Sequence, residues 1–109
     1  MIKFVNMTPH VINVIKPNSE KKIEPSGDTI RLVEDWNKIN RLGGIDVLIC
    51  YYSSEVELPP ILDDTYYIVS AMIANAFPER EDFLIVAKTI RDENGHIAGC
   101  KAFARITNN

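Results

Sequence analysis

The sequence predicts a mainly β protein of the α+β class, with an antiparallel or mixed sheet or open barrel and one short helix. Short runs rich in β-branched and aromatic residues recur along the chain and alternate with turn residues, as in sheets and barrels. Only residues 70–77 have a convincing helical pattern, and the strand–helix alternation of a parallel doubly wound sheet is missing. The chain has 109 residues, enough for one compact domain, so we expect residues 1–109 to form a single domain.

A C-terminal β-hairpin is the most clearly predicted element. Residues 84–91 and 98–106 are rich in apolar and β-branched side chains, and Asn94-Gly95 lies between them. An Asn-Gly pair between two such runs is a strong hairpin signal, because both residues tolerate positive φ. We therefore expect the two runs to pair antiparallel.

The register of this hairpin would create a cluster of cations. A tight turn places Glu93 opposite His96, and the same register places Lys88 opposite Lys101. Like charges that face each other in a sheet destabilise it, so either solvent screens the two lysines or an anion lies between them. A bulged three-residue loop is the alternative, and it would shift the pairing by one residue and separate the lysines.

A short helix is expected over residues 70–77. Ser70 is a good N-cap, because its hydroxyl accepts a hydrogen bond from a free N–H group of the first turn. Pro78 ends the helix. Two turns are marginal in isolation, so we expect the helix to pack on the small-residue face of the C-terminal hairpin. This face consists of Ile85, Ala87, Thr89, Ala98, Cys100, Ala102 and Ala104, with Arg91 at its end. The apolar face of the helix is formed by Met72, Ile73, Ala76 and Phe77.

The rest of the chain reads as short strands joined by turns that contain Pro, Gly, Asn and Ser. Residues 34–44 leave two alternatives open, either one or two helical turns or a strand with a bulge. Residues 45–52 are strongly β by composition. Beyond these and the C-terminal hairpin, strands are expected at residues 1–5, 11–15, 21–24, 29–33, 56–58 and 66–69.

Composition excludes several classes of protein. The formal net charge is −3, which argues against a broad surface for DNA or RNA polymers and leaves room for a local phosphate pocket. Cys50 and Cys100 each lie in a predicted strand without a CxxC motif, so reduced buried thiols and a cytosolic location are expected. The N-terminus has no apolar segment typical of a signal peptide, and no apolar run reaches the length of a membrane span. We expect no metal site, no cofactor and no membrane association.

No sequence motif indicates catalysis. The chain has no GxSxG, no HExxH and no glycine-rich phosphate loop. His10 and His96 both lie near predicted turns. A nucleophile–base pair of Cys100 with His10 is conceivable, but a cysteine in the middle of a strand is more simply a packed core thiol. We therefore predict no catalytic residue.

Residues suited to binding are more numerous. Arginine and lysine bind phosphate, turns present backbone and side-chain donors together, and aromatic rings stack on bases. Salt bridges to neighbouring acids are the competing role for the arginines, and capping of sheet edges is the competing role for the tyrosines. The phosphate candidates are Arg80, Lys88, Arg91, Lys101 and Arg105; the polar candidates are Thr8, His10, Ser26 and Asn94; the stacking candidates are Tyr51, Tyr67 and Phe103.

Five stretches of the chain give it a resemblance to a family of small, mostly phage-encoded proteins. That family opens with Asn-Leu-Thr-Pro-His, followed by a Pro-Ser-Gly turn. Tyr-Ile-Val-Ser then precedes a short helix that ends in Pro-x-Arg, and the C-terminal part reads Arg-Asp-x-x-Gly-x-x-x-Gly-Cys. The matching stretches span nearly the whole chain and lie at residues 6–10, 25–27, 67–70, 78–80 and 91–100.

The resemblance implies that the protein blocks the host's nucleotide-triggered defence against the phage. Met7 replaces the family's usual Leu, which conserves volume. Small phage proteins of this kind include anti-CBASS sponges, oligomeric proteins that sequester cyclic dinucleotides such as 3′3′-cGAMP in the cytoplasm of the bacterial host. The resemblance therefore implies a cyclic oligonucleotide ligand, tight binding without cleavage, and a homo-oligomer, either a dimer or a tetramer.

Two other functions remain open at this point. The chain could be a phage accessory protein that binds a host protein through its tyrosine-rich edge, because exposed tyrosines often mark an interface. It could also hydrolyse a nucleotide signal, with His10 or His96 as the acid or base.

Overall fold

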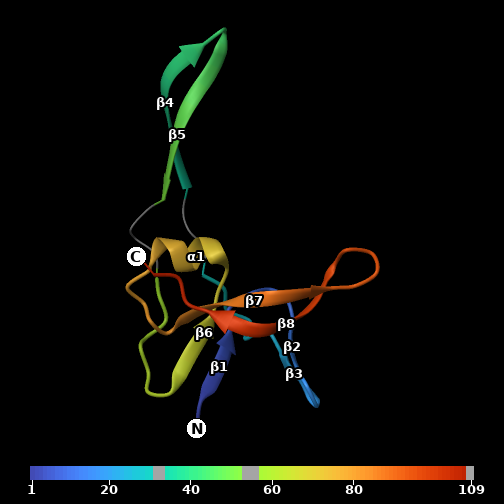
Figure 1. Ribbon diagram of the computed structural model, residues 1–109. Coiled ribbons are helices and arrows are strands. Elements are labelled where there is room, and N and C mark those ends of the chain that lie inside the picture. The colour runs from blue at the N-terminus through green and yellow to red at the C-terminus, as the bar shows by residue number, and fades with distance from the viewer. Residues whose placement is uncertain (31–33, 53–56, 108–109) are drawn as a thin grey trace.

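The computed structural model describes residues 1–30, 34–52 and 57–107 and confirms a mainly β fold with one short helix (Figure 1). Six strands form one mixed sheet in the order β1-β6-β7-β8-β2-β3, and β4 and β5 form a separate two-stranded sheet. The elements in chain order are β1 (Lys3–Asn6), β2 (Ile12–Lys16), β3 (Ser19–Ile23), β4 (Glu34–Leu42), β5 (Ile45–Tyr52), β6 (Thr65–Ile68), α1 (Ala71–Ala76), β7 (Phe83–Arg91) and β8 (Ile97–Ala104).

The six-stranded sheet curls into a half-barrel, so its two edge strands, β1 and β3, approach each other at one end. Strands β1, β6 and β7 are parallel to one another, β8 is antiparallel to β7 and parallel to β2, and β3 closes a hairpin with β2. At the end of β1, Asn6 bridges to Pro25, just beyond β3. The Asn6 side chain is buried and donates to the carbonyls of Ile23 (3.1 Å) and His10 (2.6 Å).

The same Asn6 explains the Asn-x-Thr-Pro-His stretch in structural terms. Its carboxamide oxygen accepts hydrogen bonds from the Thr8 N–H (2.9 Å) and the Thr8 hydroxyl (2.6 Å), which forms a local side-chain turn. Ser26 donates its backbone N–H to the Asn6 carbonyl at 2.8 Å. One buried amide therefore joins the end of β1, the turn before β2 and the chain after β3.

The hydrophobic core lies on both faces of the sheet. On one face, α1 packs against β7, and the buried cluster consists of Tyr67, Val69, Ile73, Ala74 and Phe83. On the other face, the buried cluster consists of Ile12, Ile23, Ile68 and Cys100. Side chains alternate between the two faces of a strand, so Tyr67 and Val69 belong to the first cluster and Ile68, between them, belongs to the second.

The helix begins as predicted. The Ser70 hydroxyl accepts a hydrogen bond from the backbone N–H of Ile73 at 3.3 Å, and α1 continues to Ala76. Ile85, on the small-residue face of the C-terminal hairpin, packs against the cluster that contains Ile73 and Ala74. The helix therefore docks on the Ile85 part of this face, whereas Cys100, predicted on the same face, belongs to the cluster on the opposite side of the sheet.

The C-terminal hairpin is present, but its predicted tight turn is wrong. Asp92 and His96 close a three-residue loop, with the Asp92 N–H donating to the His96 carbonyl at 2.8 Å. Within this loop only Gly95 takes a positive φ, 82°, and the Asp92 carboxylate accepts hydrogen bonds from the backbone N–H groups of Asn94 and His96. This carboxylate organises the loop in a way that the Asn-Gly signal does not predict.

A second irregularity restores the predicted register beyond the loop. The ladder shifts at Ile90 and Arg91, and Ile90 then faces Gly99 as it would have done with a two-residue turn. The same register continues to Ile85, which faces Ala104. The three-residue loop therefore does not separate the two lysines, and Lys88 and Lys101 lie between the paired residues Ala87↔Ala102 and Thr89↔Cys100.

Lys88 is the most unusual residue of the hairpin, because it has a positive φ of 51°. Cys100 and Phe103 on the facing strand both contact the second core cluster, although a regular strand would point residues three apart to opposite faces. The distorted backbone at Lys88 lies between their partners Thr89 and Val86. We infer that this kink turns both side chains toward the same cluster.

We expect Lys88→Gly to raise the free energy of unfolding by about 0.5–1 kcal/mol. The left-handed conformation costs roughly 1–2 kcal/mol for a residue with a Cβ, and about half of that gain is offset by the larger chain entropy of glycine in the unfolded state. Urea unfolding gives the measurement. The matched control is Thr89→Gly, at the next exposed strand position, which should lose about 0.5–1 kcal/mol. Equal destabilisation by the two variants would contradict the explanation.

Several strand predictions need correction. Of residues 34–44, Glu34–Leu42 form a strand with a bulge between Lys38 and Asn40, which was one of the two alternatives, and Gly43-Gly44 forms the turn. Thr29 and Ile30 are not in a strand, and the rest of the predicted strand at 29–33 lies outside the described residues. Glu57 and Leu58 are also not in a strand, and residue 56 lies outside the described residues. The described residues of both segments connect the β4–β5 hairpin to the body of the molecule, which consists of the six-stranded sheet and α1.

Candidate ligand-binding site

A shallow aromatic trough lies on the sheet face opposite α1. Phe4 of β1 is the partner of Tyr66 in the parallel ladder, and their rings are 6.1 Å apart. Phe103 of β8 brings a third ring 5.3 Å from that of Phe4. We call this cavity of about 450 Å³ the aromatic trough; it is lined by Ile2, Phe4, Tyr66, Leu84, Phe103, Ala104 and Arg105.

The fold explains why these rings face away from the helix. Val5 and Tyr67, the sequence neighbours of Phe4 and Tyr66, pack into the cluster beneath α1. Because strand side chains alternate, Phe4 and Tyr66 point to the opposite face. Phe103 faces Val86 across the hairpin and joins them there.

Two cations border the trough. The Lys21 ammonium lies 5.6 Å from the centre of the Phe4 ring, within the range of a cation–π interaction. Arg105 lines the cavity, and its Nε donates to the Glu81 carbonyl at 2.7 Å. This hydrogen bond fixes the position of the guanidinium group, which is otherwise exposed. The trough therefore combines ring faces with positive charge at two points.

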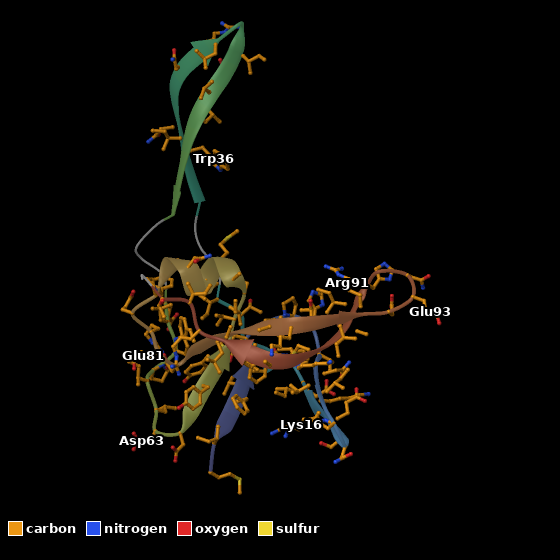
Figure 2. The ribbon with its side chains drawn as sticks, viewed as in Figure 1. Lys16, Trp36, Asp63, Glu81, Arg91 and Glu93 are labelled. Carbon is orange, nitrogen blue, oxygen red and sulfur yellow. The ribbon has the colours of Figure 1, made fainter. Side chains whose placement is uncertain are left out.

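The charge on the other side of Arg105 is negative. A neighbouring cavity shares Arg105 and Tyr66 with the trough, and Asp63 and Glu81 lie close together at this end of the molecule (Figure 2). An anion would be repelled from this side and attracted toward Lys21. The acidic side chains of the neighbouring cavity are Asp63, Asp64, Glu79, Glu81 and Asp82.

Arg80 has a structural role. Its guanidinium group forms a two-point ion pair with Asp82 (2.8 Å each) and donates to the Pro59 carbonyl at 2.9 Å. It also stacks on the Phe83 ring at 4.4 Å, and the Arg80 side chain is only 10% exposed. The hydrogen bond to Asp82 raises the pKa of Arg80 above its ordinary value. Its charge is paired with Asp82 and three of its N–H donors are engaged, so the structure gives Arg80 a role in the fold and places it outside the aromatic trough.

The structure places Tyr67, one of the predicted stacking residues, in the core and away from the trough. Its ring is 4% exposed and packs edge-on against Phe83, and its hydroxyl donates to the Pro60 carbonyl at 2.7 Å. Its neighbour Tyr66 is the tyrosine that faces the trough. Tyr51 lies in β5, but the position of its side chain is not described by the structure.

The remaining basic candidates do not converge on the trough. Arg91 lies near the loop of the C-terminal hairpin, at the opposite end of β7 from Glu81 (Figure 2). Its guanidinium group donates to the Gly95 carbonyl at 2.7 Å, next to Asn94 in the same loop. Lys88 and Lys101 are exposed near the middle of the two strands. Of the five predicted phosphate candidates, only Arg105 lines the aromatic trough.

The polar candidates near the N-terminus serve local structure. The Thr8 hydroxyl donates to Asn6, and the Ser26 hydroxyl donates to the Asp28 carbonyl at 3.2 Å. His10 is exposed and lines a different cavity of about 300 Å³, which it shares with Cys100. Burial raises the pKa of the Cys100 thiol, against a smaller opposing effect of a backbone hydrogen bond with Ala102. A thiol held in its neutral form is a poor nucleophile.

Sequence reasoning missed two aromatic residues of the trough, Phe4 and Tyr66, and the neighbouring cation Lys21. Phe4 and Tyr66 belong to predicted strands, but nothing local indicates that residues so far apart in the chain pair in parallel. Lys21 comes from β3, at the far end of the strand order from β1, and only the curling of the sheet brings it to Phe4. Phe103 and Arg105 are the two predicted residues that the structure places together here.

No family model, curated protein or solved structure matches the chain. Within residues 1–30, 34–52 and 57–107, no group of three or more His, Cys, Asp or Glu side chains is placed to hold a metal ion. The helix in this described part of the chain is too short to cross a lipid bilayer.

Proposed function

We propose that the protein is a phage anti-defence protein that binds cyclic dinucleotide immune signals, such as 3′3′-cGAMP, and sequesters them intact in the cytoplasm of the host. The observation that carries this proposal is the aromatic trough with Lys21 and Arg105 at its border. A cyclic dinucleotide presents two flat bases and two phosphates. Aromatic faces stack on bases, and lysine or arginine neutralises phosphates.

The size of the trough supports a ligand shared between subunits. Its volume of about 450 Å³ falls within the range of small-molecule sites, but it is open on one side. A second copy of the chain, related by a two-fold axis, would close it with an identical set of rings and cations. Two-fold symmetry suits a ligand with two bases and two phosphates. We therefore propose a homo-oligomer, a dimer or a tetramer, as the binding form.

We expect Phe103→Leu and Lys21→Ala to weaken the binding of 3′3′-cGAMP by about tenfold to a hundredfold each. Loss of one base-stacking ring costs roughly 1–3 kcal/mol, and loss of a charge-assisted phosphate contact costs roughly 1.5–3 kcal/mol. Leucine keeps most of the apolar volume of Phe103, so the packing of the second core cluster should survive. Isothermal titration calorimetry measures the effect.

The control is Arg91→Ala, which removes a positive charge at the hairpin loop, away from the trough, and should leave the affinity unchanged. If the wild type binds no member of a panel of cyclic oligonucleotides, the proposed function is wrong. If the wild type binds and both trough variants bind equally well, the function stands and the site lies elsewhere. Ligand released by heat should be chemically intact; recovery of a linear product would instead favour a hydrolase.

A further inference from the structure

The β4–β5 hairpin stands apart from the rest of the molecule as an arm. It projects from the body and shares no strand pairing with the six-stranded sheet within the described residues (Figure 1). Trp36 lies on this arm, well away from the body, and is 57% exposed (Figure 2). Other exposed apolar residues of the arm are Leu42, Ile45, Leu48 and Ile49.

The exposed apolar side chains and the two-stranded architecture of the arm indicate that another element packs against it. Leu48 and Ile49 are consecutive strand residues and are each 47% exposed, so apolar side chains lie on both faces of the ribbon. An isolated two-stranded hairpin is marginally stable in water, and stability requires further strands or packing against another element. Among the described residues, no further strand of the same chain pairs with this hairpin.

The two outer edges of the arm differ in chemistry. The edge of β4 carries a bulge at Lys38/Asn40, and four of its nine residues are charged: Glu34, Asp35, Lys38 and Arg41. Charges and bulges are the devices that protect an edge strand from pairing. In β5, one of eight residues is charged, Asp46, and Arg41 lies 3.8 Å from it across the hairpin. The edge of β5 is therefore the unprotected one.

We propose that β5 pairs antiparallel with β5 of a second copy of this chain, so that two arms form a four-stranded sheet. Antiparallel pairing of two identical strands places a two-fold axis near the middle of the strand, at Leu48 or Ile49. In both registers Asp46 faces an uncharged residue near the far end of the partner strand, so no like charges meet. Neither β4, with its charges and bulge, nor β3, with Glu20, Lys21 and Lys22, offers such a self-complementary edge.

The inference does not depend on the proposed ligand, because the arm is separate from the aromatic trough and self-association is measured without nucleotide. The protein alone is examined by sedimentation equilibrium. We expect the wild type to be a dimer or an even multiple of it. The double variant Leu48→Lys/Ile49→Lys should weaken self-association by about a hundredfold or more, because either register then places two lysines against each other at the axis.

The matched control is Leu42→Lys, which places a lysine at another exposed apolar position of the arm, near its tip and away from the axis. It should leave the oligomeric state unchanged. Circular dichroism and thermal unfolding of the body verify that the variants are folded.

Cysteine cross-linking gives an independent readout. In a Cys50→Ser background, Leu48→Cys or Ile49→Cys should form a disulfide-linked dimer under mild oxidation, and Leu42→Cys should not, because only residues near the axis meet their own copies. A monomeric wild type at about 50 µM, well above typical dissociation constants of stable dimers, would overturn the proposal. So would a dimer that the double lysine variant leaves intact.

Discussion

The variant Arg80→Ala should lose roughly 3–5 kcal/mol of its free energy of unfolding, the cost of removing one partner from a buried ion pair. The Asp82 side chain is 11% exposed and receives both of its short hydrogen bonds from Arg80. Without the guanidinium group, this carboxylate remains buried without its charge partner. The Pro59 carbonyl also loses a donor, and the Phe83 ring loses the planar group that stacks on it.

Urea denaturation of the variant gives this number directly. The control is Arg91→Ala, in which the removed side chain is exposed and donates one hydrogen bond to the hairpin loop, so a loss within about 1 kcal/mol is expected. The double variant Arg80→Ala/Asp82→Ala should lose less than the sum of the two single variants, because it leaves no unpaired charge. Similar losses for Arg80→Ala and Arg91→Ala would show that the ion pair does not stabilise the fold.

The variant Asn6→Ala should be destabilised by about 2–4 kcal/mol, because each buried polar group left without a partner costs roughly 1–3 kcal/mol and water reaches some of them. The amide donates to the carbonyls of His10 and Ile23 and accepts from Thr8 twice. Alanine removes all four hydrogen bonds at the point where the two ends of the curled sheet meet.

Asn13→Ala is the matched control. The Asn13 amide donates one exposed hydrogen bond, to the Ala98 carbonyl at 3.1 Å, so its loss should cost about 1 kcal/mol or less. Asn6→Asp should remain destabilised, because a carboxylate keeps the acceptor for Thr8 but cannot donate to the two carbonyls. If thermal unfolding shows the same destabilisation for Asn6→Ala and Asn13→Ala, the closure of the half-barrel does not depend on the Asn6 amide.

Local signals in the sequence predicted the elements whose geometry is local. The hydroxyl of Ser70 and the position of Pro78 define α1, and the apolar runs around Asn94-Gly95 define β7 and β8. The exact turn was missed because the carboxylate of Asp92, a residue outside the Asn-Gly pair, selects a three-residue loop. A compensating irregularity at Ile90 and Arg91 then restores the register.

The candidate site was harder to predict because it depends on contacts between distant parts of the chain. Parallel pairing of β1 with β6 has no local signature, yet it places Phe4 beside Tyr66. The choice between Tyr66 and Tyr67 depends on which face of β6 receives the helix. Charge in the sequence does not reveal that the Arg80 guanidinium is already engaged by Asp82, while Arg105 keeps an exposed guanidinium group at the trough.

The projecting arm also determines how the molecule moves in solution. The radius of gyration is 17.3 Å, and the principal extents are 57 × 39 × 31 Å. A compact chain of this length has a radius of gyration of about 13 Å. A monomer will therefore diffuse slowly for its mass and elute early from a size-exclusion column, where it resembles a compact dimer. Small-angle X-ray scattering of such a monomer would show an asymmetric pair-distance distribution with a tail toward long distances, and pairing of two arms would lengthen that tail further.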